Sequence, residues 1–429
     1  LPKLSLSTPE SSLTAAVTLD MNAFSDKNPG KVQASIEASI GKQDIMRFMG
    51  GMPTEFIRRW PNQPLSIKGS VRGNMRRIDI GGISLRLPTA LTAFAKGYAA
   101  NVTDPRRLKA NVMVDAHAHN LDFITTLMDA QTSKMVRIPQ GIAVKGMLKA
   151  DGSRYSADIV ASEGGGKVKA KGYVDVDGMA YDVAVDAVRL QLQHFLPTLG
   201  LSPFSGKAVA KGRGTDMFSR RTRLSARAEI NDFHYAGYDL SGMKADATVA
   251  DGHGNANLEG HNSLIDGLIT ANMLMQKHGV TGTFSCDLRT ADLYALHITK
   301  KPVQMGMCGH IDLDTNMKEH HKLSGFVSDI TIRTEKQTFR PADIMVDALT
   351  RRDTTRARLR CGDFSVSLNA RGGYERLTRE CQKFIGEMNK QLADNYIDQL
   401  KLRRKLPTMC IKLNAGRDNV FCRALRALM

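Results

Sequence analysis

Residues 138–201 show most clearly the pattern of apolar and polar positions that runs through much of the chain. From Gly141, apolar side chains alternate with polar or small ones, as expected of a strand with one buried face. Asp151-Gly152 then predicts a tight turn, because the favoured two-residue hairpin turns need a positive φ that glycine adopts readily. A return strand begins at Tyr155. The pattern therefore predicts a β-hairpin.

A second hairpin is predicted after the glycines at 164–166. Apolar or small residues occupy the even positions from Val168 to Val176, Asp177-Gly178 predicts the turn, and alternation resumes at Tyr181. We expect lysines on the opposite face, and inward-facing Lys167, Lys169 and Lys171 would contradict this register. The expected lining of the apolar face is Val144, Val168, Ala170, Val174, Val176, Val183 and Val185.

Short segments that break the alternation recur along the chain and predict caps between groups of strands. They lie at 43–50, 120–128, 190–197 and 290–296. Each is followed by a proline and then by a glycine-bearing predicted strand, at 64–69, 139–146, 203–206 and 302–309. The spacing is irregular, which predicts a loose internal repeat.

One long segment changes period from two to between three and four. From Tyr374 to about Arg404 this spacing predicts an amphipathic helix that ends before Pro407. The helix either covers an open face or edge of the sheet or acts as a gate or partner-binding element. The expected organisation is a repetitive β-groove over 1–373, a helical insertion over 374–406 and a resumed β-groove over 407–429.

These elements predict an all-β fold, built as an elongated, repetitive antiparallel sheet with short caps and one long amphipathic helix. The apolar alternation continues through most of the chain with few large aromatic residues. We therefore expect the sheet to curl into an open apolar groove rather than a compact barrel. Apolar surface in water is unfavourable by roughly 25 cal/mol per Å², so the groove should hold apolar material or be covered.

The amino-acid composition indicates which kinds of partner and which cysteine chemistry to expect. Sixty Lys and Arg against 43 Asp and Glu give a formal net charge of +17, which favours acidic partners. Alternation alone places the runs of lysines on solvated strand faces. The short arginine runs are not interleaved with exposed aromatic residues on which bases could stack, so we expect no nucleic-acid partner. The six cysteines fit neither a zinc module nor a redox pair, and predict packed small side chains or one disulfide.

Candidate catalytic and metal-binding chemistry is sparse. Asp115, His117 and His119 would share one strand face, but successive members would stand roughly 6.5 Å apart, so a shared ion would need ligands from another strand. The glycine-rich segments at 164–166 and 212–214 have no phosphate-binding signature and are interpreted as turns. Nucleophile-elbow and zinc-protease motifs are absent from the sequence. We expect no metal, no cofactor and no enzymatic activity.

The repeat resembles a known family. The segments that begin Gln43-Asp44-Ile45-Met46, Asn120-Leu121-Asp122-Phe123 and Leu190-Gln191-Leu192, together with the helix ending at 400–407, resemble the TamB (translocation and assembly module) and AsmA-like family of diderm bacterial envelope proteins. The resemblance spans nearly the whole chain, without the family's N-terminal membrane anchor or C-terminal domain. The chain is therefore expected to be a middle segment of a longer protein.

The resemblance implies a β-taco groove in a periplasmic protein anchored in the inner membrane. Such a groove would conduct phospholipid acyl chains between the inner and outer membranes. The family is also linked to assembly of outer-membrane proteins with a barrel partner, so the alternative is a scaffold that pairs its strand edges with client polypeptide. An extracellular adhesin or passenger solenoid would instead have a closed core without lipid.

Overall fold

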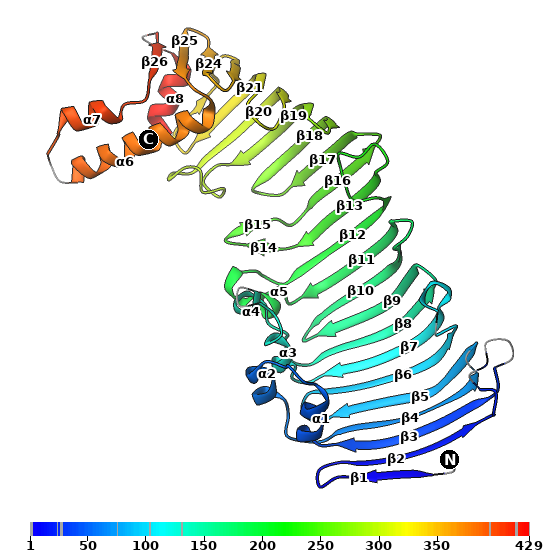
Figure 1. Ribbon diagram of the computed structural model, residues 1–429. Coiled ribbons are helices and arrows are strands. Elements are labelled where there is room, and N and C mark those ends of the chain that lie inside the picture. Colours follow the sequence, from blue (N-terminus) through cyan, green and yellow to red (C-terminus); the bar gives the residue numbers. More distant parts are fainter. Residues whose placement is uncertain are drawn as a thin grey trace. The chain divides into compact units, whose positions relative to one another are not determined.

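The computed structural model describes residues 3–23, 25, 29–74, 76–102, 104–129, 132–393, 396–416 and 419–428. It is mostly antiparallel β-structure, and 24 of its strands belong to one large sheet that does not close into a barrel. The chain divides into two compact units, Leu1–Arg213 with Ala226–Ser241 and Gly214–Ser225 with Gly242–Met429. Figure 1 shows both units in chain order. The all-β prediction is confirmed at this level.

The first unit contains twelve strands of the large sheet, a separate two-stranded hairpin and several short helices in the connections between strands. Its sheet strands are β1 (Leu4–Ser7), β2 (Ser12–Leu19), β3 (Val32–Ile40), β4 (Leu65–Asn74), β5 (Arg77–Leu87), β6 (Leu91–Ala100), β7 (Lys109–Ala118), β8 (Ile142–Asp151), β9 (Arg154–Glu163), β10 (Gly166–Asp175), β11 (Ala180–Leu190) and β12 (Phe204–Arg213). The other elements are α1 (Lys42–Phe48), α2 (Thr54–Arg59), η1 (Pro105–Arg107), α3 (Asp122–Thr125), α4 (Thr132–Met135), α5 (Leu192–Phe195), η2 (Pro197–Leu199), β14 (His234–Tyr235) and β15 (Tyr238–Asp239). β13 (Arg223–Asp232) spans the division between the units.

Strands β1 to β12 pair in chain order, each antiparallel to the next. Helices α1 to α5 therefore all lie in connections at the same end of the strands, as Figure 1 shows. The connections at the opposite end include the tight turns that alternation and Asp-Gly pairs predicted. Antiparallel order thus gives this part of the sheet a helix-capped end and a hairpin end.

The two predicted hairpins are present, with one turn displaced by a residue. Asp151 pairs with Arg154, so Gly152 and Ser153 form the two-residue turn, with Gly152 at φ +59°. The turn was predicted at Asp151-Gly152, with glycine in the second position. It forms one residue later, with Gly152 in the first position, where its positive φ is needed. Asp177 and Gly178 lie in the turn between β10 and β11.

The glycine-rich segments were only partly interpreted correctly. Gly164 and Gly165 form a turn, but Gly166 already belongs to β10. Gly212 lies in β12 and pairs with Tyr181, so the segment 212–214 is mainly the end of a strand rather than a turn.

Three of the four predicted caps form helices, and the fourth forms a turn. The segments 43–50, 120–128 and 190–197 contain α1, α3 and α5. The fourth, 290–296, begins inside β19 (Gly279–Asp292) and continues as a turn. Strands begin directly after Pro64, Pro203 and Pro302, which is consistent with proline ending one element before the next begins.

The main core cluster of the first unit lies beneath α1 to α3, at the capped ends of β4 to β7. Phe56 and Leu87 are each 3% exposed, and Ala90 is fully buried. The ring of Phe123 contacts those of Phe56 and Trp60 at centroid distances of 5.7 and 4.9 Å. Edge-to-face aromatic packing of this kind adds to the stabilisation from apolar burial.

The second unit continues the antiparallel pattern and contains the longest strands. Its elements are β16 (Met243–Ala250), β17 (His253–His261), β18 (Ile265–Gln276), β19 (Gly279–Asp292), β20 (Val303–Thr315), β21 (His321–Thr334), β22 (Thr338–Phe339), β23 (Ile344–Thr350), β24 (Thr354–Cys361), β25 (Phe364–Arg371), α6 (Tyr374–Ala393), α7 (Gln399–Lys405), β26 (Met409–Asn414) and α8 (Val420–Leu428). Its core cluster joins Val303, Ile330, Ile332, Phe339 and Ala424 at strand ends near α8.

The single helix predicted over 374–404 is wrong, because the structure has two helices there. α6 ends at Ala393, residues 394 and 395 lie outside the described residues, and α7 begins at Gln399. Asp398 caps the start of α7, because its carboxylate accepts a hydrogen bond from the Lys401 amide at 3.0 Å. A separate helix therefore begins at Gln399. The apolar spacing persists through Tyr396 and Leu400, so periodicity alone could not locate the break.

Two further features lie in the C-terminal segment. β26 pairs with β25 and continues the sheet, whereas the helix α8 was not predicted for a segment interpreted as resumed β-structure. Ala424 of α8 is 1% exposed, which shows that the helix is held by its apolar face. The division into segments 1–373, 374–406 and 407–429 stays a prediction.

Candidate functional site

The strand register places apolar residues in four continuous rows across one face of the first unit's sheet. Each row links directly paired residues on neighbouring strands. The rows are Leu4–Ala15–Ile36–Gly69–Ile83–Ala95–Val114–Gly146–Ile159–Ala170–Val185–Ala208; Leu13–Ala38–Ile67–Leu85–Ala93–Ala116–Val144–Ala161–Val168–Ala187–Gly206; Val17–Ala34–Val71–Ile80–Gly97–Val112–Leu148–Ala157–Gly172–Val183–Ala210; and Leu19–Val32–Gly73–Ile78–Ala99–Ala110–Ala150–Tyr155–Val174–Tyr181–Gly212. We call this surface the apolar face. Tyr155 and Tyr181 contribute its only side-chain hydroxyls.

The structure brings six of the seven predicted lining residues together on the apolar face. Val168 and Val144 belong to one row, Ala170 pairs with Val185 in another, and Val183 and Val174 lie in the remaining two. Val176 follows the end of β10 and is 61% exposed, so it lies beside the face rather than in a row. These positions agree with the predicted alternation, while their contact with lipid stays a prediction.

The apolar face is open toward the hairpin end of β8 to β10. Leu148, Tyr155 and Val174 are 44%, 47% and 46% exposed although each lies between paired strands. Together with Ala170 and Val183, they line a hollow of about 400 Å³. Such exposure of large apolar side chains within a continuous apolar surface is typical of a binding surface.

The opposite face carries the charges. Lys167, Lys169 and Lys171 are all exposed and lie at the strand positions between the apolar rows, as predicted. Directly opposed residues form ion pairs there, with Nζ–O distances of 3.1 Å for Lys145–Asp115, 3.2 Å for Lys171–Asp158 and 3.7 Å for Lys211–Asp182. We call this surface the polar face.

Sequence reasoning missed part of the apolar face. Leu148, Tyr155, Ala157, Ile159 and Ala161 occupy the rows beside the predicted valines. Their alternation along β8 and β9 was visible in the sequence. Which residues lie opposite them depends on the turn register, which moved by one residue at Gly152.

The same arrangement recurs in the second unit. Three rows there join directly paired apolar residues: Ala245–Leu258–Ile269–Cys286–Gly309–Val327–Ile344–Cys361–Phe364; Ala247–Ala256–Ala271–Phe284–Ile311–Gly325–Val346–Leu359–Val366–Leu413; and Val249–Gly254–Met273–Gly282–Leu313–Leu323–Ala348–Ala357–Leu368–Ile411. A fourth row becomes polar at Thr315, His321, Thr350 and Thr355. Each unit therefore has one apolar face of its own.

The carboxylate and histidines singled out by sequence lie on or beside β7. Asp115 is engaged by Lys145 at 3.1 Å and by the His117 ring at 3.3 Å, and the hydrogen bond from Lys145 is the main reason its pKa is lowered. His119 follows the end of the strand. Among the residues described, no group of three or more His, Cys, Asp or Glu side chains is arranged to hold a metal ion.

All six cysteines are free thiols in the structure. Cys361 is 1% exposed and its Sγ contacts the Ala342 carbonyl oxygen at 3.1 Å, and burial raises the pKa of its thiol. Cys286 is half-buried and belongs to an apolar row, where burial likewise raises the thiol pKa. These two cysteines pack as small side chains.

No helix in the described ranges is long and apolar enough to cross a membrane. Comparison of the chain with protein-family models, curated proteins and solved structures finds no match.

Proposed function

We propose that this protein is a periplasmic segment of a TamB or AsmA-like bridge, and that its apolar face carries phospholipid acyl chains between the inner and outer membranes. Transfer is passive, and it involves no covalent step and no cofactor. Head groups stay at the margin of the face, where water solvates them. The parent protein would be anchored in the inner membrane by a segment outside this chain and would meet a barrel partner at the outer membrane.

The observation that supports this proposal is the continuity of the apolar rows, one of which crosses β1 to β12 while the other three cross β2 to β12. Strands lie about 4.8 Å apart, so a row across twelve strands extends roughly 53 Å. One acyl layer is about 15 Å thick, half of the roughly 30 Å hydrocarbon core, and so spans about three strand spacings. A chain could therefore move from strand to strand without meeting a charged side chain.

The side chains in the rows suit a sliding ligand better than a fixed one. They are mainly valine, alanine, isoleucine and glycine, which give a low-relief surface with few hydrogen-bonding groups. The half-exposed residues around the 400 Å³ hollow leave room for a chain to lie on the face. Apolar burial at roughly 25 cal/mol per Å² would favour that contact.

Lipid mass spectrometry tests the proposal. The chain is produced in a diderm bacterium, purified without detergent and extracted, beside a variant carrying Val174→Asp and Val183→Asp. Two carboxylates on the apolar face would have to be desolvated beneath an acyl chain, so bound phospholipid should be lost.

The matched control carries Ser156→Asp and Ala184→Asp, which place the same charges on the polar face. Ser156 pairs with Lys149, and Ala184 pairs with Lys171. This control should fold and keep its phospholipid. A folded native chain without phospholipid, or equal loss from both variants, would contradict the proposal.

A second function, scaffolding of outer-membrane protein assembly, is supported by the strand β26. Within the described ranges β26 pairs with β25 alone, and Ile411 and Leu413 are 55% and 62% exposed. An exposed apolar strand of this kind can add a client strand. Proline has no N–H to donate, and the N–H groups of consecutive strand residues point to opposite sides of the strand. Proline is therefore placed at Ile411 in one variant and at Lys412 in another, so that one of the two removes a donor from the free edge of β26. That variant should abolish crosslinking to a barrel-protein client while leaving bound lipid unchanged.

A further inference from the structure

The strand β24 carries a row of three arginines on the face of the second unit that lies opposite its apolar rows, which we call the polar face of that unit. Arg356, Arg358 and Arg360 are all exposed and alternate with the half-buried Ala357 and Leu359. Successive guanidinium-bearing residues are therefore attached roughly 6.6 Å apart on one side of the strand. Within the described part of the chain, none of the three arginines has an ion-pair partner or a side-chain hydrogen bond.

The cross-strand neighbours of these arginines differ from those of the lysines in the first unit. Lys145, Lys171 and Lys211 each face an aspartate and bind it. By contrast, Arg356 lies between Leu349 and Asn369. Arg360 lies between Met345 and Ser365, so neither of these arginines has an acidic neighbour in the register.

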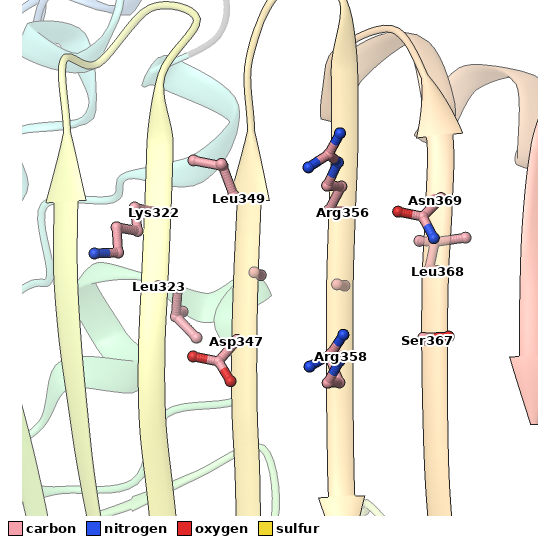
Figure 2. A pocket seen from close by; sticks show the side chains of 11 residues that line it. Lys322, Leu323, Asp347, Leu349, Arg356, Arg358, Ser367, Leu368 and Asn369 are labelled. Atoms are coloured by element: carbon pink, nitrogen blue, oxygen red, sulfur yellow. The ribbon is translucent and has the colours of Figure 1, made fainter. Parts of the chain in front are cut away.

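Asp347 is the acidic residue directly opposite Arg358, and it does not neutralise the row. No ion pair joins the two side chains among the residues the structure describes. Figure 2 shows the Asp347 carboxylate turned toward β21, away from Arg358. The positive charge of β24 therefore stays available to a ligand.

Arg356 and Arg358 border a hollow of about 280 Å³ on this face. Arg356 and Arg358 project from β24 on the same side, whereas Lys322 of β21 lines the margin of the hollow with its ammonium group turned away from β24 (Figure 2). Ser367 and Asn369 of β25 line the opposite margin and offer neutral hydrogen-bond donors. The hollow thus combines two guanidinium groups and neutral donors, with one lysine and one carboxylate at its margin.

We propose that this hollow binds a phosphate-bearing ligand through Arg356 and Arg358. The planar guanidinium group donates paired hydrogen bonds to phosphate oxygens, and Lys322 at the margin adds to the positive charge around the hollow. An anion placed between the arginines also relieves their mutual repulsion. The phosphate belongs either to a lipid head group or to a small soluble phosphate.

This site is independent of the proposed acyl-chain path. The arginines alternate with Ala357 and Leu359, which belong to the apolar rows, so the two surfaces lie on opposite faces of β24. Failure of the acyl-chain proposal would leave the arginine site standing, and the reverse also holds. The two proposals are therefore tested by different substitutions.

The test uses two probes on the full chain. Inorganic phosphate is followed by line broadening of its ³¹P resonance, and co-sedimentation measures binding to phosphatidylcholine vesicles with and without phosphatidic acid. Arg356→Gln with Arg358→Gln should weaken binding by roughly tenfold or more, because each removed partner makes a charge-assisted hydrogen bond. Binding of the native chain should also weaken as salt is raised.

Three further variants separate a specific site from general charge. Lys171→Gln with Lys211→Gln removes two positive charges from the polar face of the first unit and should leave binding unchanged. Arg356→Lys with Arg358→Lys keeps the charge but loses the paired donors, and should bind with intermediate affinity. Asp347→Asn should tighten binding. Circular dichroism checks that each variant is folded.

The probes also distinguish the two sources of phosphate. Arginine-dependent binding of inorganic phosphate alone supports a soluble ligand, and arginine-dependent binding of phosphatidic acid vesicles alone supports a lipid head group. Binding of neither probe by the native chain would overturn the proposal. Equal loss in the arginine and lysine variants would overturn it as well.

Discussion

The first unit has two apolar regions that differ in burial although they contain similar residues: the core cluster beside its helices and the open part of the apolar face. At the helix-capped end, Phe56, Leu87 and Phe123 are 3%, 3% and 7% exposed. Toward the hairpin end of the same sheet, Leu148 and Val174 are 44% and 46% exposed. The difference follows from the connections, because those at one end provide α1 to α5, whereas the short turns at 152–153 and 176–179 at the other end provide no cover for Leu148 and Val174.

This difference separates stability from binding. Side chains beneath the caps are removed from water in the folded chain and stabilise it by roughly 25 cal/mol per Å² of buried apolar area. The exposed rows contribute less to the free energy of folding, because much of their apolar surface is still in contact with water in the folded chain. Substitutions should therefore affect stability at the capped end and ligand binding toward the hairpin end.

The largest effect is expected at the capped end. Phe123→Ala removes a ring packed against Phe56 and Trp60, and should lower the free energy of unfolding by about 3–4 kcal/mol. Urea denaturation measures this change. Tyr155→Ala, in the open region at the hairpin end with 47% exposure, is the matched aromatic control and should cost about 1 kcal/mol or less. Equal losses would contradict the distinction between the two regions.

A smaller effect is expected where the rows contain glycine. A Cβ at Gly172 would lie 2.2 Å from the Asp182 carbonyl oxygen and 2.7 Å from the Val183 Cα, so the backbones of β10 and β11 would have to separate. Gly172→Ala should therefore lower the free energy of unfolding by about 1–3 kcal/mol. Gly165→Ala has open space around its Cβ and should be nearly neutral in the same urea experiment.

A local, pH-dependent effect is expected between α6 and α7. Glu387 is 6% exposed and accepts from Lys401 at 3.1 Å, and hydrogen bonds from Lys405, Gln391 and Lys401 lower its pKa from 4.5 to about 2. A lowered folded-state pKa stabilises the contact above pH 4.5, and that contribution is lost as the pH falls toward 2.

Hydrogen exchange of the α7 amides, corrected for intrinsic rates, measures this change. Protection should decrease between pH 5 and pH 3 in the native chain, and Glu387→Gln should remove that dependence. Protection of native α7 that stays constant through this window would show that Glu387 does not hold the helices together.

The smallest change in stability is expected at the hollow itself. Val174→Ala removes two methyl groups from a side chain that is 46% exposed, so the free energy of unfolding should fall by less than about 1 kcal/mol. Thermal unfolding followed by circular dichroism measures it. A loss as large as that of Phe123→Ala would mean that Val174 is part of the core rather than of a binding surface.

Alternation predicted the faces of the sheet because side chains on a strand change sides at every residue. It placed Val168 and Lys169 on opposite faces, as the structure has them. It could not predict which strand residues pair, because pairing depends on turn length, as at Gly152. The four rows became visible only with the register.

Helix boundaries were less accessible to sequence reasoning. The break between α6 and α7 depends on the cap at Asp398 and on the contact of Glu387 with α7, whereas the apolar spacing continues across it. The helix α8 was missed although Val420 and Ala424 are four residues apart, which is helical spacing. Alternation in the preceding strands favoured a strand interpretation. The arginines of β24 were visible as an alternating strand, but their lack of acidic neighbours required the pairing.

Photo-crosslinking tests the central claim most directly. A photoreactive amino acid is placed at Val174, in the open region of the apolar face, or at Ser156, on the polar face, and the chain is irradiated in cells of a diderm bacterium. Intact-mass analysis then detects covalent phospholipid adducts. The account predicts adducts at Val174 and few or none at Ser156. Equal adducts at both positions, or adducts at neither in a folded chain, would contradict an acyl-chain path along the apolar face.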